Sequence, residues 1–412
     1  MNILYVNHYA GSPELGMEYR PYFLAREWVH AGHRGTMVAA SFSHVRARQP
    51  RLAHIGGAQM IDGIEYCWLR TPRYTGNGVG RVVNILSFLA PLWLRAGRWA
   101  RELRPDVVIA SSTYPMDIWP ARRIARSRGA KSARLVYEVH DLWPLSPIEL
   151  TGMSPRHPFA RWCQIAENAA YREADVVVSM LPNVHTHMAE HGLDLDRLVI
   201  VPNGIDPGEW EQPAPPLRAD VVEAISRARV AGRLVVGYAG SMGLPNALDV
   251  LLDAARRVTE LPLAFVLIGD GHERSRLEAR ISRENLAQVT LLPPIPKSQM
   301  PSFLSAIDIA YIGWQRKPIY RFGIAPNKLL DYMMAGCPVL HSVEAGNDPV
   351  QEAECGISVA AESTDAVVDG LQRLSRVSPD ERRAMGRRGR DHVLANYAYP
   401  VLARRFLQAV AP

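Results

Sequence analysis

A chain of 412 residues with 48% hydrophobic content is too long for one ordinary domain, and it predicts two domains of about 200 residues with sizeable cores. Its four cysteines show neither C-x-x-C spacing nor zinc-type histidine pairing, which indicates a reducing compartment and argues against a structural metal. The formal net charge of +6 lies in residues 1–200, which contain 23 basic and 17 acidic residues. This excess suggests an anionic partner, although a solvated arginine-rich surface would also explain it.

The first half of the chain alternates short apolar runs with longer amphipathic stretches, which predicts strands and helices in turn. The predicted strands span 2–8, 36–41, 64–71, 106–112, 135–140 and 175–181. The predicted helices span 19–31, 79–103, 115–128, 158–172 and 183–192. Because such alternation is typical of βαβ units, we expect a parallel sheet covered by helices on both faces.

The alternation pauses at V-P-N-G-I-D and a proline-rich segment, so residues 201–217 predict a linker between domains at 1–200 and 218–397. The predicted strands of the second domain span 234–241, 263–268, 289–292, 309–312 and 338–343, and its predicted helices span 246–259, 272–284 and 327–335. Residues 398–412 are expected to form a helix that packs back on the first domain. We expect two Rossmann-like α/β domains whose parallel sheets face across a cleft, with ligands at the carboxyl ends of the strands.

The sequence G-I-A-P-N-K-L-L-D-Y-M-M-A-G-C-P at 323–338 predicts a loop followed by an amphipathic helix. Pro326 suits the first helical turn, and Gly336 suits a left-handed C-terminal cap. The free N–H groups of the helix start, with Lys328 in the first turn, suit phosphates. Asp331 lies on the same side and can accept hydrogen bonds from sugar hydroxyls. The pair fits a nucleotide diphosphate, although an ordinary amphipathic helix with one exposed Lys–Asp pair would share this sequence.

Other candidate contacts follow predicted strands. Gly16 permits close backbone approach at a helix start, although a surface turn would also need it. His140 and Asp141 end another strand, where a histidine can carry a proton or donate a hydrogen bond, unless it is a structural histidine bonded to backbone. Gly240 opens a glycine-rich turn that suits phosphates. The G-x-G-x-x-G fingerprint is missing from the sequence, which argues against a nicotinamide cofactor.

Together these motifs resemble those of the retaining glycosyltransferases of family four, which have the two-domain GT-B fold. The resemblance covers essentially the whole chain, and it is carried by N-H-Y-A-G-S-P-E-L-G-M-E-Y-R-P, H-D, V-P-N-G-I-D, G-Y-A-G-S-M-G, G-D-G and G-I-A-P-N-K-L-L-D-Y-M-M-A-G-C-P-V. It is closest to the branch that builds bacterial O-antigen and capsule repeats, often with N-acetylated aminodeoxy sugars. It implies sugar transfer from a nucleotide-diphosphate sugar, expected to be UDP-linked, to a saccharide or polyprenyl-linked acceptor, without a cofactor.

The resemblance also implies roles for individual residues. His140, with Asp141 beside it, would lie against the transferred sugar, and Lys328 would stabilise the leaving diphosphate. Glu18 and Arg20 would face the acceptor. The implied donor-binding residues are Gly16, Gly240, Ser241, Ile295, Arg316, Gly323, Ile324, Ala325, Asn327, Lys328, Leu329 and Asp331. Within this set, Asp331 would hold the ribose hydroxyls, and Ile295 would meet the base through its backbone.

The sequence departs from the family pattern in two places. The first glutamate of the family's E-x7-E motif would fall at Gly323, and we expect the backbone N–H groups of 323–325 to replace it. The usual Arg and Lys after the glycine-rich turn are also missing, and Ser241 and Asn246 lie there instead. Other cations are then needed for the phosphates, and the candidates are Lys328, Arg316, Lys317 and Arg321. Since no D-x-D motif suggests bound Mg²⁺, we expect transfer without a metal.

Two other classes of protein remain as alternatives. Sugar-nucleotide epimerases share this architecture, but they need carboxylates around the sugar ring, and Gly323 removes one. Two-lobed binding proteins are normally secreted, whereas the N-terminus lacks the basic region of a signal peptide. Nucleic acid is not expected as a partner, and no apolar run is long enough to predict a transmembrane span.

The helix predicted at 79–103 contains more apolar residues than one buried stripe needs, and Pro91 should bend or break it. Arg95, Arg98 and Arg101 lie near its end, where basic residues suit an anionic membrane surface. We therefore expect a cytoplasmic enzyme that is held reversibly at the inner face of the membrane. Packing of this helix against the first sheet is the alternative.

Overall fold

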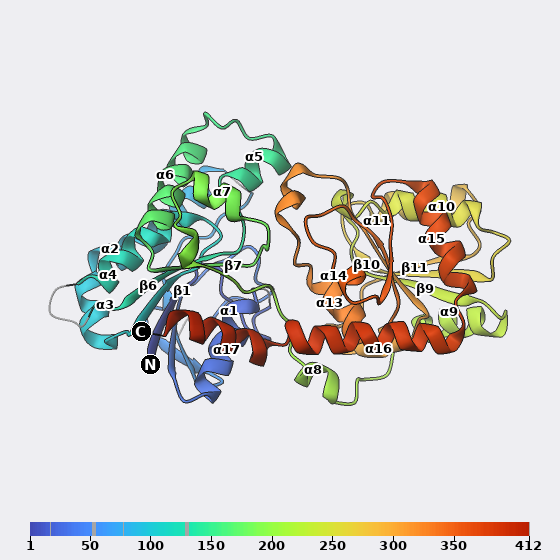
Figure 1. Cartoon of the computed structure of the whole chain (residues 1–412), viewed down its shortest axis with the longest axis horizontal. Coiled ribbons are helices and arrows are strands. Elements are labelled where there is room, and N and C mark those ends of the chain that lie inside the picture. The colour runs from blue at the N-terminus through green and yellow to red at the C-terminus, as the bar shows by residue number, and fades with distance from the viewer. Residues whose placement is uncertain (17, 52–54, 77, 128–131, 412) are drawn as a thin grey trace. The chain divides into compact units, whose positions relative to one another are not determined.

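The computed structural model describes residues 1–16, 18–51, 55–76, 78–127 and 132–411, and these form two compact units (Figure 1). The first unit comprises Met1–Asn203 and Tyr399–Pro412, and the second comprises Gly204–Ala398. Each unit is an α/β domain with its own sheet, as the alternating pattern predicts. Met17 and the last residue of the helix predicted at 115–128 lie outside the described residues.

The first unit is built on an eight-stranded sheet in the order β3-β4-β2-β1-β5-β6-β7-β8. Its strands are β1 (Asn2–Val6), β2 (Arg34–Ala40), β3 (Ala58–Ile61), β4 (Ile64–Leu69), β5 (Val107–Ala110), β6 (Arg134–Val139), β7 (Val176–Ser179) and β8 (Leu198–Ile200). Neighbouring strands pair in parallel, except β3 with β4. Two of these strands were not predicted: β3, which has only one β-branched residue, and β8, which has only three residues.

Helices cover this sheet on both faces, as expected (Figure 1). They are α1 (Arg20–His30), α2 (Val79–Leu94), α3 (Ala96–Leu103), α4 (Ile118–Ala125), α5 (Leu145–Thr151), α6 (Pro158–Glu173), α7 (His185–Glu190) and α17 (Tyr399–Val410). The last helix, α17, packs against α1: the Trp28 indole donates a hydrogen bond to the Ala403 carbonyl at 3.2 Å, and the rings of Phe23 and Tyr399 stack at 4.7 Å. The final segment therefore completes the core of the first unit.

The helix predicted at 79–103 is two helices, α2 and α3, bent by 63° at Arg95. Pro91 lies inside α2 and cannot donate the backbone hydrogen bond of its turn. The Pro91 carbonyl accepts the Arg95 N–H, and the chain leaves the helical conformation at that residue. A break is therefore confirmed, one turn beyond the proline. Within the described residues no single helix is long and apolar enough to cross a membrane, although this bent pair passes by length and composition.

The second unit has a six-stranded parallel sheet in the order β11-β10-β9-β12-β13-β14. Its strands are β9 (Leu234–Ser241), β10 (Leu263–Asp270), β11 (Val289–Leu292), β12 (Ile309–Gly313), β13 (Val339–Ser342) and β14 (Gly356–Ser358). Its helices are α8 (Gly208–Glu211), α9 (Ala219–Val230), α10 (Leu248–Arg257), α11 (Arg274–Arg283), α12 (Met300–Ala306), α13 (Asn327–Met334), α14 (Pro349–Glu352), α15 (Thr364–Arg376) and α16 (Pro379–Asn396). The short helix α8 lies in the segment predicted as a linker.

The site helix α13 is held against α16 by close glycine contacts. Gly336, just after α13, has φ +71°, the left-handed conformation that the sequence predicts for the C-terminal cap. A Cβ on Gly386 of α16 would lie 1.8 Å from the Gly336 carbonyl oxygen, so no other residue fits there. The end of α13 is therefore fixed by backbone packing, which positions the polar residues of its first turns.

Candidate active site

Lys328 lies in the first turn of α13, as predicted, and its side chain turns inward over the end of β9. Its Nζ donates hydrogen bonds to the Asn246 amide oxygen at 2.6 Å and to the Tyr238 hydroxyl at 3.1 Å, and it lies 4.7 Å from the centre of the Tyr238 ring. Among the described residues no carboxylate pairs with it. Burial lowers the pKa of Lys328 to about 8. The lysine is thus a desolvated cation without an anion.

Gly240 makes room for this lysine. It has φ +148°, and a Cβ there would lie 3.2 Å from Lys328 Nζ and 3.3 Å from its Cε. The neighbouring turn is held by the Tyr238 hydroxyl, which donates to the Ser241 carbonyl at 2.5 Å. The structure therefore brings together the predicted Gly240, Ser241 and Lys328, and it explains the glycine by the approach of the lysine.

Asp331 lies one turn beyond Lys328, and its side chain is half-buried. Among the described residues no donor or cation bonds to its carboxylate. Burial raises the pKa of Asp331 to about 7, and the nearby charges of Lys297 and Glu209 act in opposite directions. A half-buried carboxylate without a partner is suited to hydroxyl ligands. Of its predicted neighbours, Asn327 is exposed, whereas the Leu329 side chain is fully buried in the core and cannot touch a ligand.

The expectation that the backbone N–H groups of 323–325 replace the missing glutamate is wrong for two of the three. The Gly323 N–H donates to the Tyr320 carbonyl at 2.9 Å, and the Ile324 N–H donates to the Asn347 amide oxygen at 2.7 Å. Asn347 returns a hydrogen bond to the Ile324 carbonyl at 3.1 Å. Both groups are used within the protein, because a short helical turn ends at Gly323 and Asn347 clamps the next residue. The structure shows no such bond for Ala325.

Arg316 and Arg321, proposed as phosphate ligands, are also engaged elsewhere. The Arg316 guanidinium pairs with Glu344 at 2.8 Å, and its backbone N–H donates to Glu362 at 2.9 Å. Arg321 donates to the Pro318 carbonyl at 2.6 Å. Lys317 is half-buried. Of the four candidate cations, Lys328 is therefore the one that the structure turns toward the glycine-rich turn.

Ile295 lies in the predicted proline-rich turn, half-buried against the core of the second unit. Arg218 donates to the carbonyls of Pro293 and Pro294 at 3.1 and 2.9 Å, which holds this turn. Among the described residues no hydrogen bond uses the Ile295 backbone, so its peptide groups remain available to a ligand.

In the first unit His140 lies between two carboxylates at the end of β6. Its Nε2 is 3.1 Å from Glu138 Oε2 and 2.9 Å from the Ser111 hydroxyl, and its Nδ1 is 3.8 Å from Glu18 Oε2. Burial lowers the pKa of His140, but the charge of Glu138 and hydrogen bonds to Glu138 and Glu18 outweigh it and raise that pKa to about 9. At neutral pH the imidazole is therefore protonated. The structure thus brings Glu18 and His140 together.

Arg20 does not face an acceptor: its side chain is only 3% exposed, so this prediction is wrong. Its Nε donates to Glu138 at 2.9 Å, and its terminal nitrogens donate to the carbonyls of Val201 and Pro202. The charge of Glu138 is also met by the hydroxyls of Tyr5 and Ser111, and its pKa lies well below the ordinary value because burial is outweighed by Arg20 and His140. Arg20 is thus the interior counter-ion that keeps Glu138 ionised beside His140.

Asp141 and Gly16 also have local partners. Asp141 accepts a hydrogen bond from the Ser146 hydroxyl at 2.5 Å, and burial raises its pKa. Gly16 has φ +88°, and a Cβ there would lie 2.9 Å from the Cβ and backbone nitrogen of Ala47. Contact with Ala47 therefore requires glycine at this position, independently of any ligand.

Glu167, His187 and His191 form a group whose ligand atoms lie within 4.8 Å of one another. The group was not predicted, because Glu167 lies on α6, far in sequence from His187 of α7 and His191, the residue just after α7. Glu167 accepts hydrogen bonds from Tyr171 at 3.0 Å and Gln164 at 2.7 Å, and His191 Nδ1 lies 2.8 Å from the His187 carbonyl. These bonds within the protein account for the group, and we assign it a structural role.

Four residues around the two candidate sites were not found by sequence reasoning. They are Tyr238, Asn347, Ser111 and Glu138. Glu138 lies in β6 and His140 directly follows that strand, two residues later. The period of two that places both side chains on one face was therefore the available signal. The other three come from distant segments, and nothing in the sequence links them to Lys328, Ile324 or His140.

The two units match family models of glycosyltransferases. Residues 16–204 match the Glycosyl transferase 4-like domain, and residues 233–376 match Glycosyl transferases group 1. WcaI of Escherichia coli, a colanic acid biosynthesis glycosyl transferase by name, is 22% identical over 66% of this chain and 67% of its own.

Solved structures with the same fold include sucrose-phosphate synthase of Thermosynechococcus elongatus (TM-score 0.72, 16% identity, 99% of this chain and 98% of that one). Anabaena HepE in complex with UDP and glucose also matches, with a TM-score of 0.65 and 16% identity. The match covers 100% of this chain and 99% of the HepE chain. The two α/β units thus have the fold of GT-B enzymes. Because the two family models together span most of the chain, we conclude that it belongs to the glycosyltransferases with a 4-like first domain and a group 1 second domain.

Proposed function

We propose that this glycosyltransferase moves a sugar from a UDP-linked donor to a saccharide or polyprenyl-linked acceptor of a bacterial surface polysaccharide, with retention and without a metal ion. The proposal is carried by the environment of Lys328. This lysine is a desolvated cation at a helix start, and among the described residues it has no carboxylate partner. The name of WcaI refers to colanic acid, and HepE was solved with UDP and glucose, which supports this class of donor and product.

In this proposal the second unit stabilises the leaving diphosphate. Negative charge grows on the diphosphate as its bond to the sugar breaks, and a preoriented cation lowers the energy of that state more than that of the bound donor. Tyr238 and Asn246 hold Lys328 in place, so little reorganisation is needed. Asp331 would accept the ribose hydroxyls, and the backbone of Ile295 would meet the base.

His140 would serve the transferred sugar in the first unit. Glu18 and Glu138 keep its imidazole protonated at neutral pH, so it can donate a hydrogen bond to a sugar oxygen. A protonated histidine is not a base, so we assign it a binding and positioning role at the sugar.

The test of the function is release of UDP from a panel of UDP-sugars in the presence of acceptor saccharides. Thermal-shift screening against the same panel selects the donor, because ligand binding to the native state raises the melting temperature. Conversion of the donor to its epimer without an acceptor would identify an epimerase. Binding without any turnover across the panel would identify a binding protein.

Replacing Asp331 by asparagine is expected to weaken UDP binding while leaving the fold intact, because the change removes one hydroxyl acceptor at constant shape. A lost hydrogen bond to a charged group corresponds to about 1.5–3 kcal/mol. Calorimetric titration with UDP measures the effect, and Asp365→Asn, on the surface of the same unit, is the control. If the Asp331 variant binds UDP with unchanged affinity, Asp331 does not contact the nucleotide and is only a residue on the helix surface.

Transfer is expected to continue in the presence of a chelator. The cation that the proposal requires is Lys328, and the chain has no D-x-D motif in a position suited to Mg²⁺. The rate of UDP release with and without EDTA measures this, and a loss of transfer that Mg²⁺ or Mn²⁺ restores would overturn it.

We also propose that the enzyme associates reversibly with the inner face of the cytoplasmic membrane through α2 and α3. One face of α2 exposes Val79, Val83, Leu86 and Leu94, while its opposite face packs in the first unit. The helix can therefore contact a membrane and the core of the unit at the same time. Cosedimentation with anionic vesicles tests this, with Arg95, Arg98 and Arg101 changed together to glutamine. A wild-type protein that stays in the supernatant at low salt, or a triple variant that pellets equally well, would contradict it.

A further inference from the structure

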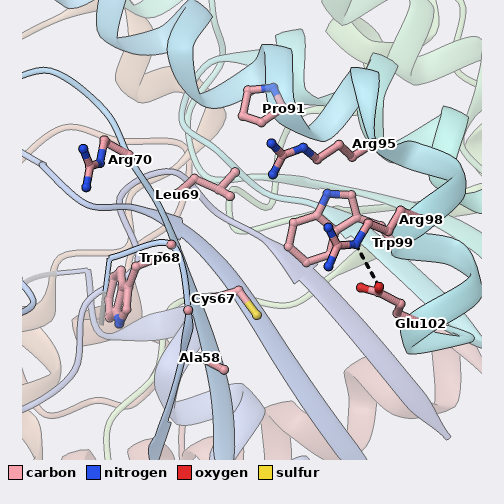
Figure 2. Close-up of a pocket in the computed structure, with 12 residues that line it drawn as sticks. Ala58, Cys67, Trp68, Leu69, Arg70, Pro91, Arg95, Arg98, Trp99 and Glu102 are labelled. Atoms are coloured by element: carbon pink, nitrogen blue, oxygen red, sulfur yellow. Dashed lines mark hydrogen bonds and ion pairs between the residues drawn. The ribbon is translucent and has the colours of Figure 1, made fainter. Parts of the chain in front are cut away.

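A pocket of about 520 Å³ opens in the first unit between β3–β4 and the bend from α2 to α3 (Figure 2). Leu69 and Cys67 of β4 line one side, and Pro91 of α2 and Trp99 of α3 line the other. The indole N–H of Trp99 is enclosed and has no hydrogen-bond partner among the described residues. The pocket therefore has an apolar wall that includes the Trp99 ring, and none of the predicted site residues lines it.

Three arginines surround this wall, at positions 70, 95 and 98. Glu102 is the acidic residue among those that line the pocket, and Arg98 donates to it at 2.8 Å, as Figure 2 shows. For Arg70 and Arg95 the structure shows no side-chain hydrogen bond or ion pair among the described residues. Two cations beside an apolar wall are complementary to a molecule in which an anionic group is attached to a hydrocarbon chain.

The surface of α2 next to the pocket is apolar. Apart from Gly80, its exposed residues fall within about 100° of arc at 3.6 residues per turn. They are Val79, Val83, Leu86, Ala90, Trp93 and Leu94. The Arg123 guanidinium lies 4.8 Å over the Trp93 ring, which adds a further basic residue at this surface. Pro91 lies about 60° around the helix from Leu94, at the nearer edge of the stripe, so the pocket opens beside the stripe.

We propose that this pocket binds the phosphate group of an anionic membrane lipid, whose acyl chains lie along the exposed stripe of α2. The inference rests on the proposed membrane association and names the ligand responsible for it. A soluble phosphorylated sugar could bind the arginines, but it would leave the apolar wall of Leu69, Pro91 and the Trp99 ring and the stripe of α2 without an apolar partner. A lipid instead uses both the uncompensated arginines and the apolar stripe.

The first experiment is cosedimentation with vesicles of phosphatidylcholine, with and without phosphatidylglycerol. Changing Arg70 and Arg95 together to glutamine is expected to weaken partition into the anionic vesicles about thirty-fold, from about 1 kcal/mol for each basic residue. The matched control changes Arg156 and Arg161 together to glutamine. Both are exposed on the same unit, and among the described residues neither side chain has a hydrogen-bond or ion-pair partner. This control removes the same charge and is expected to bind almost as wild type.

The second experiment follows alkylation of Cys67, which lines the pocket and is half-buried while the other three cysteines are buried. Phosphatidylglycerol vesicles are expected to slow the modification in wild type but not in the Arg70/Arg95 variant. Equal protection by glycerol phosphate or inorganic phosphate would identify a soluble ligand and overturn the proposal that the pocket binds a lipid.

The outcomes separate this inference from the function on which it rests. If wild type does not pellet with anionic vesicles, the proposed membrane association fails, and the lipid pocket fails with it. If wild type pellets and the Arg70/Arg95 variant pellets equally, the association stands and the pocket is wrong. An equal loss in the Arg156/Arg161 control would also overturn the pocket, because it would indicate net charge alone.

Discussion

Replacing Glu138 by glutamine is expected to lower the free energy of unfolding of the first unit by about 3–5 kcal/mol, because it leaves Arg20 buried without its charged partner. The two side chains are 3% and 0% exposed and are joined at 2.9 Å. Glutamine keeps the shape and loses the charge, so the effect reports the buried ion pair and not a cavity. Urea denaturation followed by tryptophan fluorescence measures it, since seven of the nine tryptophans belong to this unit.

The matched control is Glu65→Gln, which removes the half-buried partner of the exposed Arg34 and is expected to cost no more than about 1 kcal/mol. Equal stability of the Glu138 variant and wild type would show that water or another group meets the charge of Arg20. Replacing Arg20 and Glu138 together by methionine and glutamine is expected to recover part of the loss, because no buried charge is then left unpaired.

The pH dependence of this effect has a defined sign. The pKa of Glu138 is lowered on folding, so its ionised form stabilises the protein above its ordinary pKa of 4.5, and this stabilisation is lost as pH falls. The pKa of His140 is raised on folding to about 9, so the protonated form stabilises the protein below 6.5, and this stabilisation is lost as pH rises through 9. The difference between wild type and the Glu138 variant is therefore expected to be largest between pH 4.5 and 6.5, and to shrink as pH rises from 6.5 to 9.

Local sequence patterns were sufficient to predict the two α/β units and the course of most strands. The long strands β9 and β10 are apolar runs, and their own amino-acid composition is enough to predict them. The short β3 and β8 have little pattern of their own and pair because the neighbouring strands are already in place. Similarly, the position of the bend at Arg95 depends on where α2 and α3 each find packing, whereas the sequence indicated only that Pro91 would disturb the helix.

The candidate sites divide in the same way. Lys328, Asp331 and His140 lie on local motifs, and the sequence identified them. Their partners come from other segments, such as Asn246, 82 residues from Lys328, and no local pattern reports such a pairing. The errors at Arg20 and Arg316 have one cause: a sequence shows that a cation is present but not whether a carboxylate in the fold already neutralises it.

Replacing Lys328 by methionine is expected to weaken UDP binding about 10- to 150-fold, the equivalent of about 1.5–3 kcal/mol for a charged hydrogen bond. Methionine keeps much of the length of the side chain and removes the charge. The pKa of Lys328 is lowered on folding, so its charged form is less favourable in the fold than in the unfolded chain. The methionine variant is therefore expected to melt at the same temperature as wild type or higher, which separates lost binding from lost folding. Arg227→Gln, which removes an exposed cation of the same unit, is the control for charge alone.

The pH dependence of binding tests the same residue independently. In the free protein Lys328 loses its proton at about pH 8, whereas a bound diphosphate would hold the proton on it. The affinity of wild type for UDP is therefore expected to fall as pH rises above 8, by up to about ten-fold per pH unit, and that of the methionine variant is expected to stay level there. Calorimetric titration at pH 7, 8 and 9 in buffers of different ionisation enthalpy measures both the affinity and the proton taken up on binding. Equal pH profiles for the two proteins, or no uptake of a proton by wild type at pH 9, would show that Lys328 does not contact the diphosphate.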